Sequence, residues 1–121
     1  MARILAVDDS AAMRQMVNVT LRSAGHEVLE ACDGREALDL AIAQPAVDLV
    51  ITDVNMPRMD GITLVRELRQ LSHYRRVPLL LLTTESSPEK KSEGKAAGAT
   101  GWMVKPFSPD KLLAIVARVV A

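Results

Sequence analysis

Several features that mark common protein classes are absent from this sequence. It contains a single cysteine, Cys32, so no disulfide can form within the chain, and a reducing compartment is the natural setting. No apolar run approaches the roughly 20 residues of a membrane-spanning helix, and LLLL at 79–82 is far too short. The first residues, MARILAVDD, turn acidic at once and do not form a signal peptide. We therefore expect a cytoplasmic protein.

An excess of charge of one sign is absent as well. The chain has 15 basic and 15 acidic side chains, for a formal net charge of +0. Domains that bind nucleic acid or an anionic membrane usually carry a basic surface, so we expect neither partner. The glycine-rich phosphate loops GxGxxG and GxxxxGK[ST] are also missing, which argues against a nucleotide-binding fold.

The sequence does have enough apolar residues for a core: with 49% hydrophobic residues and a length of 121, we expect one domain over 1–121. Short apolar runs predict four strands, at 3–7, 49–52, 78–82 and 101–104, and alternation of polar and apolar residues predicts a fifth at 26–31. Five helices are predicted between and after them, each opened by a capping residue: Ser10, Asp33, Asp60, Ser87 and Ser108. Strands alternating with helices are typical of a parallel sheet covered on both faces, so we predict a doubly wound α/β fold.

Polar residues close four of the predicted strands. Asp8 and Asp9 end the first strand, Asp53 the third, Thr83 the fourth and Lys105 the fifth. In a parallel sheet the carboxyl ends of the strands lie at one edge, where ligands bind if the strand order reverses. Each of these residues taken alone is more often an ordinary turn or cap residue, but four such ends at one edge predict a functional cluster.

The composition of this predicted cluster favours phosphoryl chemistry. Two carboxylates ~4 Å apart repel by ~4 kcal/mol at an effective dielectric of ~20, and Lys105 offsets only part of that repulsion. A hard divalent cation would offset more, and ligand sets made of oxygen alone select Mg²⁺ or Ca²⁺. Because Mg²⁺ typically holds a phosphate as well, the metal and Lys105 would stabilise charge on a transferring phosphoryl group. A carboxylate can accept that group as an aspartyl phosphate.

Four sequence motifs resemble the receiver domain of two-component response regulators. They are VDDS at 7–10, DVNMPRMDG at 53–61, LTTE at 82–85 and VKPF at 104–107. The resemblance covers essentially the whole chain and is nearest to the single-domain chemotaxis regulators. It implies the flavodoxin-like strand order 2-1-3-4-5 and a switch that is activated by phosphorylation.

The resemblance also implies a role for each matching residue. Asp53 matches the phosphorylated aspartate. Asp8 and Asp9 match the acidic pair that binds Mg²⁺ together with Asp53, and Asn55 would add its backbone carbonyl. Thr83 matches the hydroxyl residue that moves to the phosphoryl oxygen.

At the fifth strand, Lys105 matches the phosphate-binding lysine, and the Lys105–Pro106 peptide bond matches one that is usually cis in the family. Thr84, Glu85 and Trp102 fall at switch or output positions. Thr84 replaces a smaller residue that is common there, and Trp102 replaces tyrosine or phenylalanine.

The predicted helix at 87–97 (SPEKKSEGKAA) has no large apolar residue, and Gly94 lowers its helix propensity by about 1 kcal/mol against alanine. We expect a solvated surface helix of low stability, directly after Thr83. In the family this helix, the fifth strand and the last helix form the output face. The stretch Tyr74–Arg76 is expected to be a solvated loop.

The partners implied by the resemblance are a sensor histidine kinase and a downstream target protein, a flagellar motor switch if the pathway is chemotaxis. The protein would be a monomeric phosphoacceptor that catalyses its own phosphorylation and dephosphorylation, not an enzyme with a separate substrate. Two alternatives stay open. One is a phosphohydrolase of the haloacid-dehalogenase type, which needs a second acid where this chain has Asn55. The other is a receiver that binds partners without phosphorylation.

Overall fold

The described part of the chain contains one parallel sheet. The computed structural model describes residues 1–84, 87–105 and 107–120. The strands of these residues are β1 (Arg3–Val7), β2 (Glu27–Ala31), β3 (Leu49–Thr52), β4 (Leu79–Thr83) and β5 (Gly101–Val104). They form a 5-stranded sheet in the order β2-β1-β3-β4-β5, and every neighbouring pair is parallel. The predicted doubly wound, flavodoxin-like fold is confirmed.

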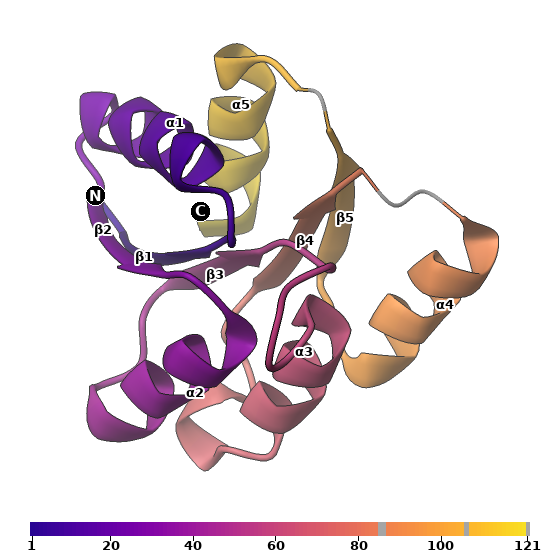
Figure 1. Ribbon diagram of the computed structural model, residues 1–121. Helices are drawn as coiled ribbons and strands as arrows, with labels where there is room; N and C mark the ends of the chain where they lie inside the picture. Colours follow the sequence, from indigo (N-terminus) through magenta and orange to yellow (C-terminus); the bar gives the residue numbers. More distant parts are fainter. Residues whose placement is uncertain (85–86, 106, 121) are drawn as a thin grey trace.

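Helices cover both faces of the sheet (Figure 1). α1 (Ala11–Ser23) and α5 (Pro109–Val120) lie on one face, and α2 (Gly34–Ala43), α3 (Gly61–Arg69) and α4 (Pro88–Ala97) on the other. A short 3₁₀ helix, η1 (Ser72–Tyr74), leads from α3 into β4. None of the helices in the described residues has an apolar stretch with the length that spanning a bilayer requires.

Alternation along the strands divides the core into two layers. Leu5, Val7 and Val50 pack toward α2 and α3, whereas Ile4 and Ile51 pack toward α1 and α5. β3 and β4 are buried along their whole length because helices cover both of their faces. The edge strand β5 is only half-buried. The sheet is therefore rigid at its centre, beneath the carboxyl ends of β1 and β3.

The five predicted capping residues all accept a hydrogen bond from the backbone three residues later. The bonds run from the Met13 N–H to Ser10, from the Glu36 N–H to Asp33, from the Thr63 N–H to Asp60, from the Lys90 N–H to Ser87 and from the Lys111 N–H to Ser108. The Cys32 N–H donates to Glu36 Oε1 at 2.9 Å, so Glu36 binds the residue before the cap and not the N–H of Asp33 that a capping box would use.

The prediction of a solvated segment at Tyr74–Arg76 is wrong for Tyr74, although Arg75 and Arg76 are exposed. Tyr74 is 1% exposed and belongs to the core layer beneath α2 and α3. The turn of η1 directs the ring inward, where the Val47 N–H donates to the phenolic oxygen at 3.4 Å. Burial accordingly raises the pKa of Tyr74. The sequence shows no apolar periodicity at this turn, so the inward orientation had no signal in the pattern.

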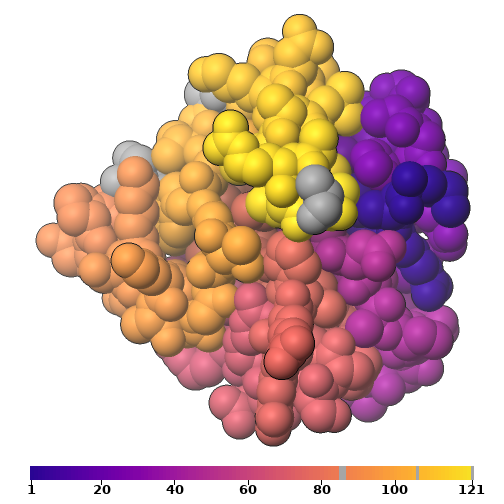
Figure 2. Space-filling view, turned by 180° about the vertical axis from the view of Figure 1, so that it is seen from behind, coloured from indigo at the N-terminus to yellow at the C-terminus, as the bar shows by residue number. Residues whose placement is uncertain are grey.

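α4 packs on the sheet through small residues, as its composition predicts. Gly94 and Ala97 are its buried positions, and Figure 2 shows α4 (light orange) standing out from the body of the molecule. A Cβ at Gly94 would lie 2.7 Å from Leu81 Cδ1 and 3.1 Å from Trp102 Cζ3. The helix backbone thus rests directly on the Leu81 and Trp102 side chains, which explains a glycine inside a helix.

This contact predicts the sign of a substitution. In a free helix Gly94→Ala would gain about 1 kcal/mol, but overpacking against Leu81 and Trp102 costs about 1–3 kcal/mol. We expect a net loss of about 1 kcal/mol, measured by urea unfolding. The control is Ser92→Ala on the exposed face of α4, which should be neutral or slightly stabilising. A Gly94→Ala protein more stable than wild type would show that α4 does not rest on Trp102.

Candidate functional site

Three carboxylates meet where the strand order reverses. Asp8 and Asp9 follow β1, Asp53 follows β3, and these two strands are neighbours in the sheet. One carboxylate oxygen from each residue lies within 4.8 Å of the other two. Asp8 is buried, Asp53 is half-buried and Asp9 is exposed, so the cluster opens to solvent on the side of Asp9. The convergence predicted from the strand ends is observed.

Backbone hydrogen bonds fix two of these carboxylates. The Ser10 N–H donates to Asp8 Oδ1 at 2.9 Å, and the Val54 N–H donates to Asp53 Oδ1 at 2.7 Å. The Asp53 N–H also continues the pairing of β3 with β1 by donating to the Val7 carbonyl at 2.9 Å. Each carboxylate therefore keeps Oδ2 for other partners.

Lys105 supplies the cation at the centre of the cluster. Its Nζ donates to Asp8 Oδ2 at 2.8 Å and to Asp53 Oδ2 at 3.3 Å, and the lysine side chain is only 10% exposed. Burial lowers the pKa of Lys105, but the hydrogen bond that Lys105 donates to Asp8 and the charge of Asp53 outweigh it and raise the pKa above its ordinary value. The ammonium is thus held charged between two carboxylates that lie far from it in sequence.

The hydroxyl residue Thr83 is joined to Lys105 through the backbone. Thr83 ends β4 and is fully buried, and its carbonyl accepts from the Lys105 N–H at 2.7 Å. Thr84 is exposed. Asn55 is exposed two residues beyond Asp53, in the loop between β3 and α3. Glu85 and the Lys105–Pro106 peptide bond, predicted cis, lie outside the described residues.

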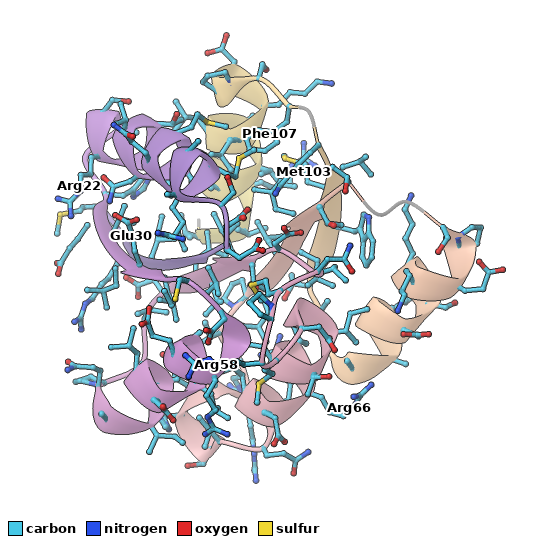
Figure 3. All side chains as sticks on the ribbon, viewed as in Figure 1. Arg22, Glu30, Arg58, Arg66, Met103 and Phe107 are labelled. Carbon is cyan, nitrogen blue, oxygen red and sulfur yellow. The ribbon has the colours of Figure 1, made fainter. Side chains whose placement is uncertain are left out.

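Trp102 is half-buried on β5 and packs toward the same core layer as α2 and α3, while Met103 packs toward α1 and α5. Side chains therefore alternate between the two faces of the sheet along this strand. Figure 3 labels Met103 and Phe107 near α5, on the far side of β5 from α4. A hollow of about 260 Å³ between α4 and β5 is lined by Trp102 with Lys91, Lys95 and Thr100.

Two arginines next to the site were missed by the sequence analysis. Arg14 of α1 donates from Nη1 to the Asp8 carbonyl at 2.6 Å, and its Nε lies 3.5 Å from Glu30 Oε1. Arg14 follows Ser10 by four residues, so helical spacing places it above the end of β1 and would have indicated it. Arg58, in the loop after Asp53, forms an ion pair with Asp33 at 2.8 Å. No periodic pattern in the sequence indicates the contact of Arg58 with Asp33.

The donor set fits a hard divalent cation. Every ligand atom of the cluster is a carboxylate oxygen, and Lys105 balances only one of the charges that Asp8, Asp9 and Asp53 can carry. Oxygen ligands with an open, solvated side suit Mg²⁺, which keeps several of its waters. The cluster is therefore a candidate magnesium site.

Comparison with known proteins identifies the family. Residues 4–117 match the response regulator receiver domain. The chain belongs to this family. A chemotaxis protein, CheY4 of Vibrio cholerae, has a solved structure that is 57% identical and covers 98% of this chain and 98% of its own, with a TM-score of 0.93. The CheY homolog of Campylobacter jejuni, a chemotaxis protein, is 40% identical over 111 residues, which is 91% of this chain and 85% of the relative.

A third similar protein bears on the metal. The receiver domain of a sensor histidine kinase from Pseudomonas aeruginosa is 30% identical, with a TM-score of 0.90 over 98% of this chain and 97% of its own. Its structure has a magnesium ion coordinated in the active-site cleft. Receiver domains bind Mg²⁺ at an acidic pocket, and the Asp8, Asp9 and Asp53 cluster is the acidic pocket of this chain.

The position of Lys105 predicts competition with the metal. Its ammonium contacts oxygens of Asp8 and Asp53 that a cation would also use. Two unit charges ~4 Å apart interact by about 1 kcal/mol even in a water-like dielectric, so Lys105→Ala should bind Mg²⁺ about fivefold more tightly or better. Isothermal titration calorimetry measures this, with Lys95→Ala, an exposed lysine of α4, as the control for the loss of one charge. Weaker binding in Lys105→Ala would mean that Lys105 supports the metal site instead.

Proposed function

We propose that this chain is a phosphorylation-activated switch that accepts a phosphoryl group on Asp53 from a sensor histidine kinase. The observation that carries the proposal is the contact of one buried ammonium, Lys105, with both Asp8 and Asp53 beside the exposed Asp9. This arrangement holds an anionic nucleophile, a phosphate-binding cation and a metal-binding carboxylate pair at one point. Family membership and the chemotaxis relatives support the same function.

In the proposed reaction Asp53 attacks the phosphorus of a phosphohistidine, an O–P bond forms, and the N–P bond to the imidazole breaks. Bound Mg²⁺, held by Asp8, Asp9, Asp53 and the Asn55 carbonyl, would neutralise charge on the phosphoryl oxygens. Lys105 would leave Asp53 for a phosphoryl oxygen, and the Thr83 hydroxyl would turn toward another. The Val54 N–H, 2.7 Å from Asp53 Oδ1, orients the carboxylate without blocking its second oxygen.

The phosphorylated form would signal by contact with a second protein. Trp102, α4 and the hollow between α4 and β5 lie on the side of the sheet next to Thr83, where the family has its output face. We propose a target in a chemotaxis pathway, a flagellar motor switch protein, because chemotaxis regulators recur among the relatives. We further propose that the chain acts in the cytoplasm as a monomeric single receiver domain over 1–121.

The alternative functions fit the site less well. A phosphohydrolase of the haloacid-dehalogenase type needs an acid two residues after the nucleophile, and Asn55 stands there. The loop from Asp53 to α3 is short and carries no inserted cap within the described residues. A receiver that works without phosphorylation would have no need to keep Asp8, Asp53 and Lys105 in mutual contact.

The proposed chemistry predicts a covalent product. Incubation with acetyl phosphate or phosphoramidate and Mg²⁺ should add the mass of one phosphoryl group to the intact protein, as measured by mass spectrometry. Asp53→Asn should abolish this gain, and Asp9→Asn should slow it by weakening the metal site. The control, Asp39→Asn, changes an exposed carboxylate on α2 and should react like wild type. An equal mass gain in Asp53→Asn would assign the phosphoryl group to another residue.

The output proposal predicts a fluorescence response. Trp102 is the only tryptophan and packs against Gly94 of α4. If Thr83 moves toward a phosphoryl group, the packing beside α4 changes and so does the indole environment. Beryllofluoride, a phosphate mimic, should therefore change Trp102 emission at saturating Mg²⁺ in wild type, and much less in Thr83→Ala. No change in wild type, or an equal change in both proteins, would show that Trp102 is not coupled to the site through Thr83.

A further inference from the structure

Arg58, in the loop that follows Asp53, has an unusual backbone. Among the described residues it is the only non-glycine residue with a positive φ, at 65°. Left-handed backbone is unfavourable for a residue with a Cβ, and glycine or asparagine usually occupies such positions. A bulky arginine persists there only if contacts made by its side chain or its neighbours hold it.

The side chain of Arg58 provides such a contact. Its Nε and Nη2 each lie 2.8 Å from Asp33 Oδ2, and Figure 3 shows Arg58 between α2 and α3. The Asp33 side chain is 6% exposed, whereas that of Arg58 is 60% exposed. The Glu36 N–H lowers the pKa of Asp33, burial opposes this, and Arg58 lowers the pKa further, so the carboxylate stays charged. The ion pair therefore anchors the exposed loop to a fixed group at the start of α2.

A backbone contact joins the same two segments. The Gly34 N–H donates to the Met59 carbonyl at 3.1 Å, and a Cβ at Gly34 would lie 2.5 Å from that oxygen. Only glycine permits this approach. The helix start thus holds two consecutive loop residues, Arg58 by its side chain and Met59 by its backbone.

The contacts of Arg58 and Met59 with the start of α2 affect the metal site because Asn55 lies between them and Asp53. Asp53 is fixed at one end of the loop by the Val7 carbonyl and the Val54 N–H. The Gly61 N–H donates to the Val54 carbonyl at 2.8 Å and closes the loop at its base. Asn55 lies in the span between Asp53 and Arg58, so the direction of its carbonyl depends on where both ends are held.

We propose that the ion pair of Arg58 with Asp33 positions the loop at 54–60 for metal binding, by holding the Asn55 carbonyl toward Asp8, Asp9 and Asp53. This rests on the proposed function, which assigns Mg²⁺ to those groups. Arg58 and Asp33 are positioning residues, because neither belongs to the candidate metal-binding cluster. Their effect is to set the loop in its binding geometry before the cation arrives, so that binding does not have to order it.

The proposal predicts a change opposite in sign to simple electrostatics. Removing a cation near a Mg²⁺ site reduces charge repulsion and should tighten binding. If Arg58 positions the loop, Arg58→Ala instead weakens Mg²⁺ binding, by about tenfold, as for other groups that orient a metal ligand. In phosphorylation by acetyl phosphate, the Mg²⁺ concentration for half-maximal rate rises by the same factor, and the rate at saturating Mg²⁺ stays near wild type.

The test is isothermal titration calorimetry with Mg²⁺ on the full chain, after circular dichroism has confirmed that each variant is folded. The variants are Arg58→Ala, Arg58→Gly, Asp33→Asn and the double variant Arg58→Ala/Asp33→Asn. Arg58→Gly relieves the backbone strain and serves as the variant most certain to fold. The matched control is Arg35→Ala, which removes the same charge from an exposed ion pair with Asp39 on α2.

We expect Arg58→Ala and Arg58→Gly to bind about tenfold more weakly, the double variant to bind no more weakly than Arg58→Ala, and Arg35→Ala to bind like wild type or slightly more tightly. Unchanged or tighter binding in Arg58→Ala would overturn the proposal. Wild-type affinity in Arg58→Gly would overturn it as well, because the backbone and not the ion pair would then set the site.

The same titrations separate this inference from the proposed function. If wild type binds Mg²⁺ and Asp9→Asn weakens that binding, the metal site stands, and Arg58→Ala alone decides the role of the ion pair. If wild type does not bind Mg²⁺, or Asp9→Asn binds it equally well, the assignment of the metal site is wrong, and the proposed positioning role of Arg58 is wrong as well.

Discussion

The contact of Lys105 with Asp8 and Asp53 is the interaction on which the site depends. Burying an ammonium or a carboxylate alone costs free energy, because the charge loses its hydration. Here the cost is offset because each charge lies beside one of opposite sign. The three residues come from the ends of β5, β1 and β3, so the contact forms only when the sheet is complete. The strands between them are buried on both faces, and that rigidity fixes the distances. A phosphoryl group on Asp53 would alter this balance directly, because it brings new negative charge to the lysine.

The surroundings of this centre differ in how firmly they are held. On the α2 side, the loop after Asp53 is tied by the Arg58 ion pair and by the Gly34 contact with Met59. On the α4 side, the helix after Thr83 rests on the sheet through Gly94 and Ala97 and buries no large side chain. Local stability follows burial, so a change of charge at the centre would displace the α4 side more readily than the α2 side. We therefore expect the α2 side to keep its geometry and the α4 side to respond when the charge at the centre changes.

The sequence predicted the elements and the residues at the strand ends because those features follow local rules. Alternation and apolar runs marked the strands, capping residues marked each helix start, and the topology of a parallel sheet brought Asp8, Asp53 and Lys105 to one edge. It did not predict the inward turn of Tyr74, the bond from Arg14 to the Asp8 carbonyl, or the pair of Arg58 with Asp33. The contacts of Tyr74 and of Arg58 join segments that are far apart in sequence, and a periodic pattern of apolar residues gives no information about such contacts. Asp33 was correctly predicted as a helix cap, but a cap uses one carboxylate oxygen and leaves the other free for a partner that capping rules do not name.

That second oxygen shows how one residue can link folding to function. Asp33 Oδ1 accepts from the Glu36 N–H and starts α2, while Oδ2 accepts from Arg58 and holds the loop after Asp53. The left-handed backbone of Arg58 is unfavourable, and the two charge-assisted hydrogen bonds to the buried Asp33 carboxylate oppose that cost. A glycine at position 58 would avoid the strain but would leave the loop without its anchor. The strained arginine is therefore better explained by the position it gives the loop than by the stability of α2, which its cap already provides.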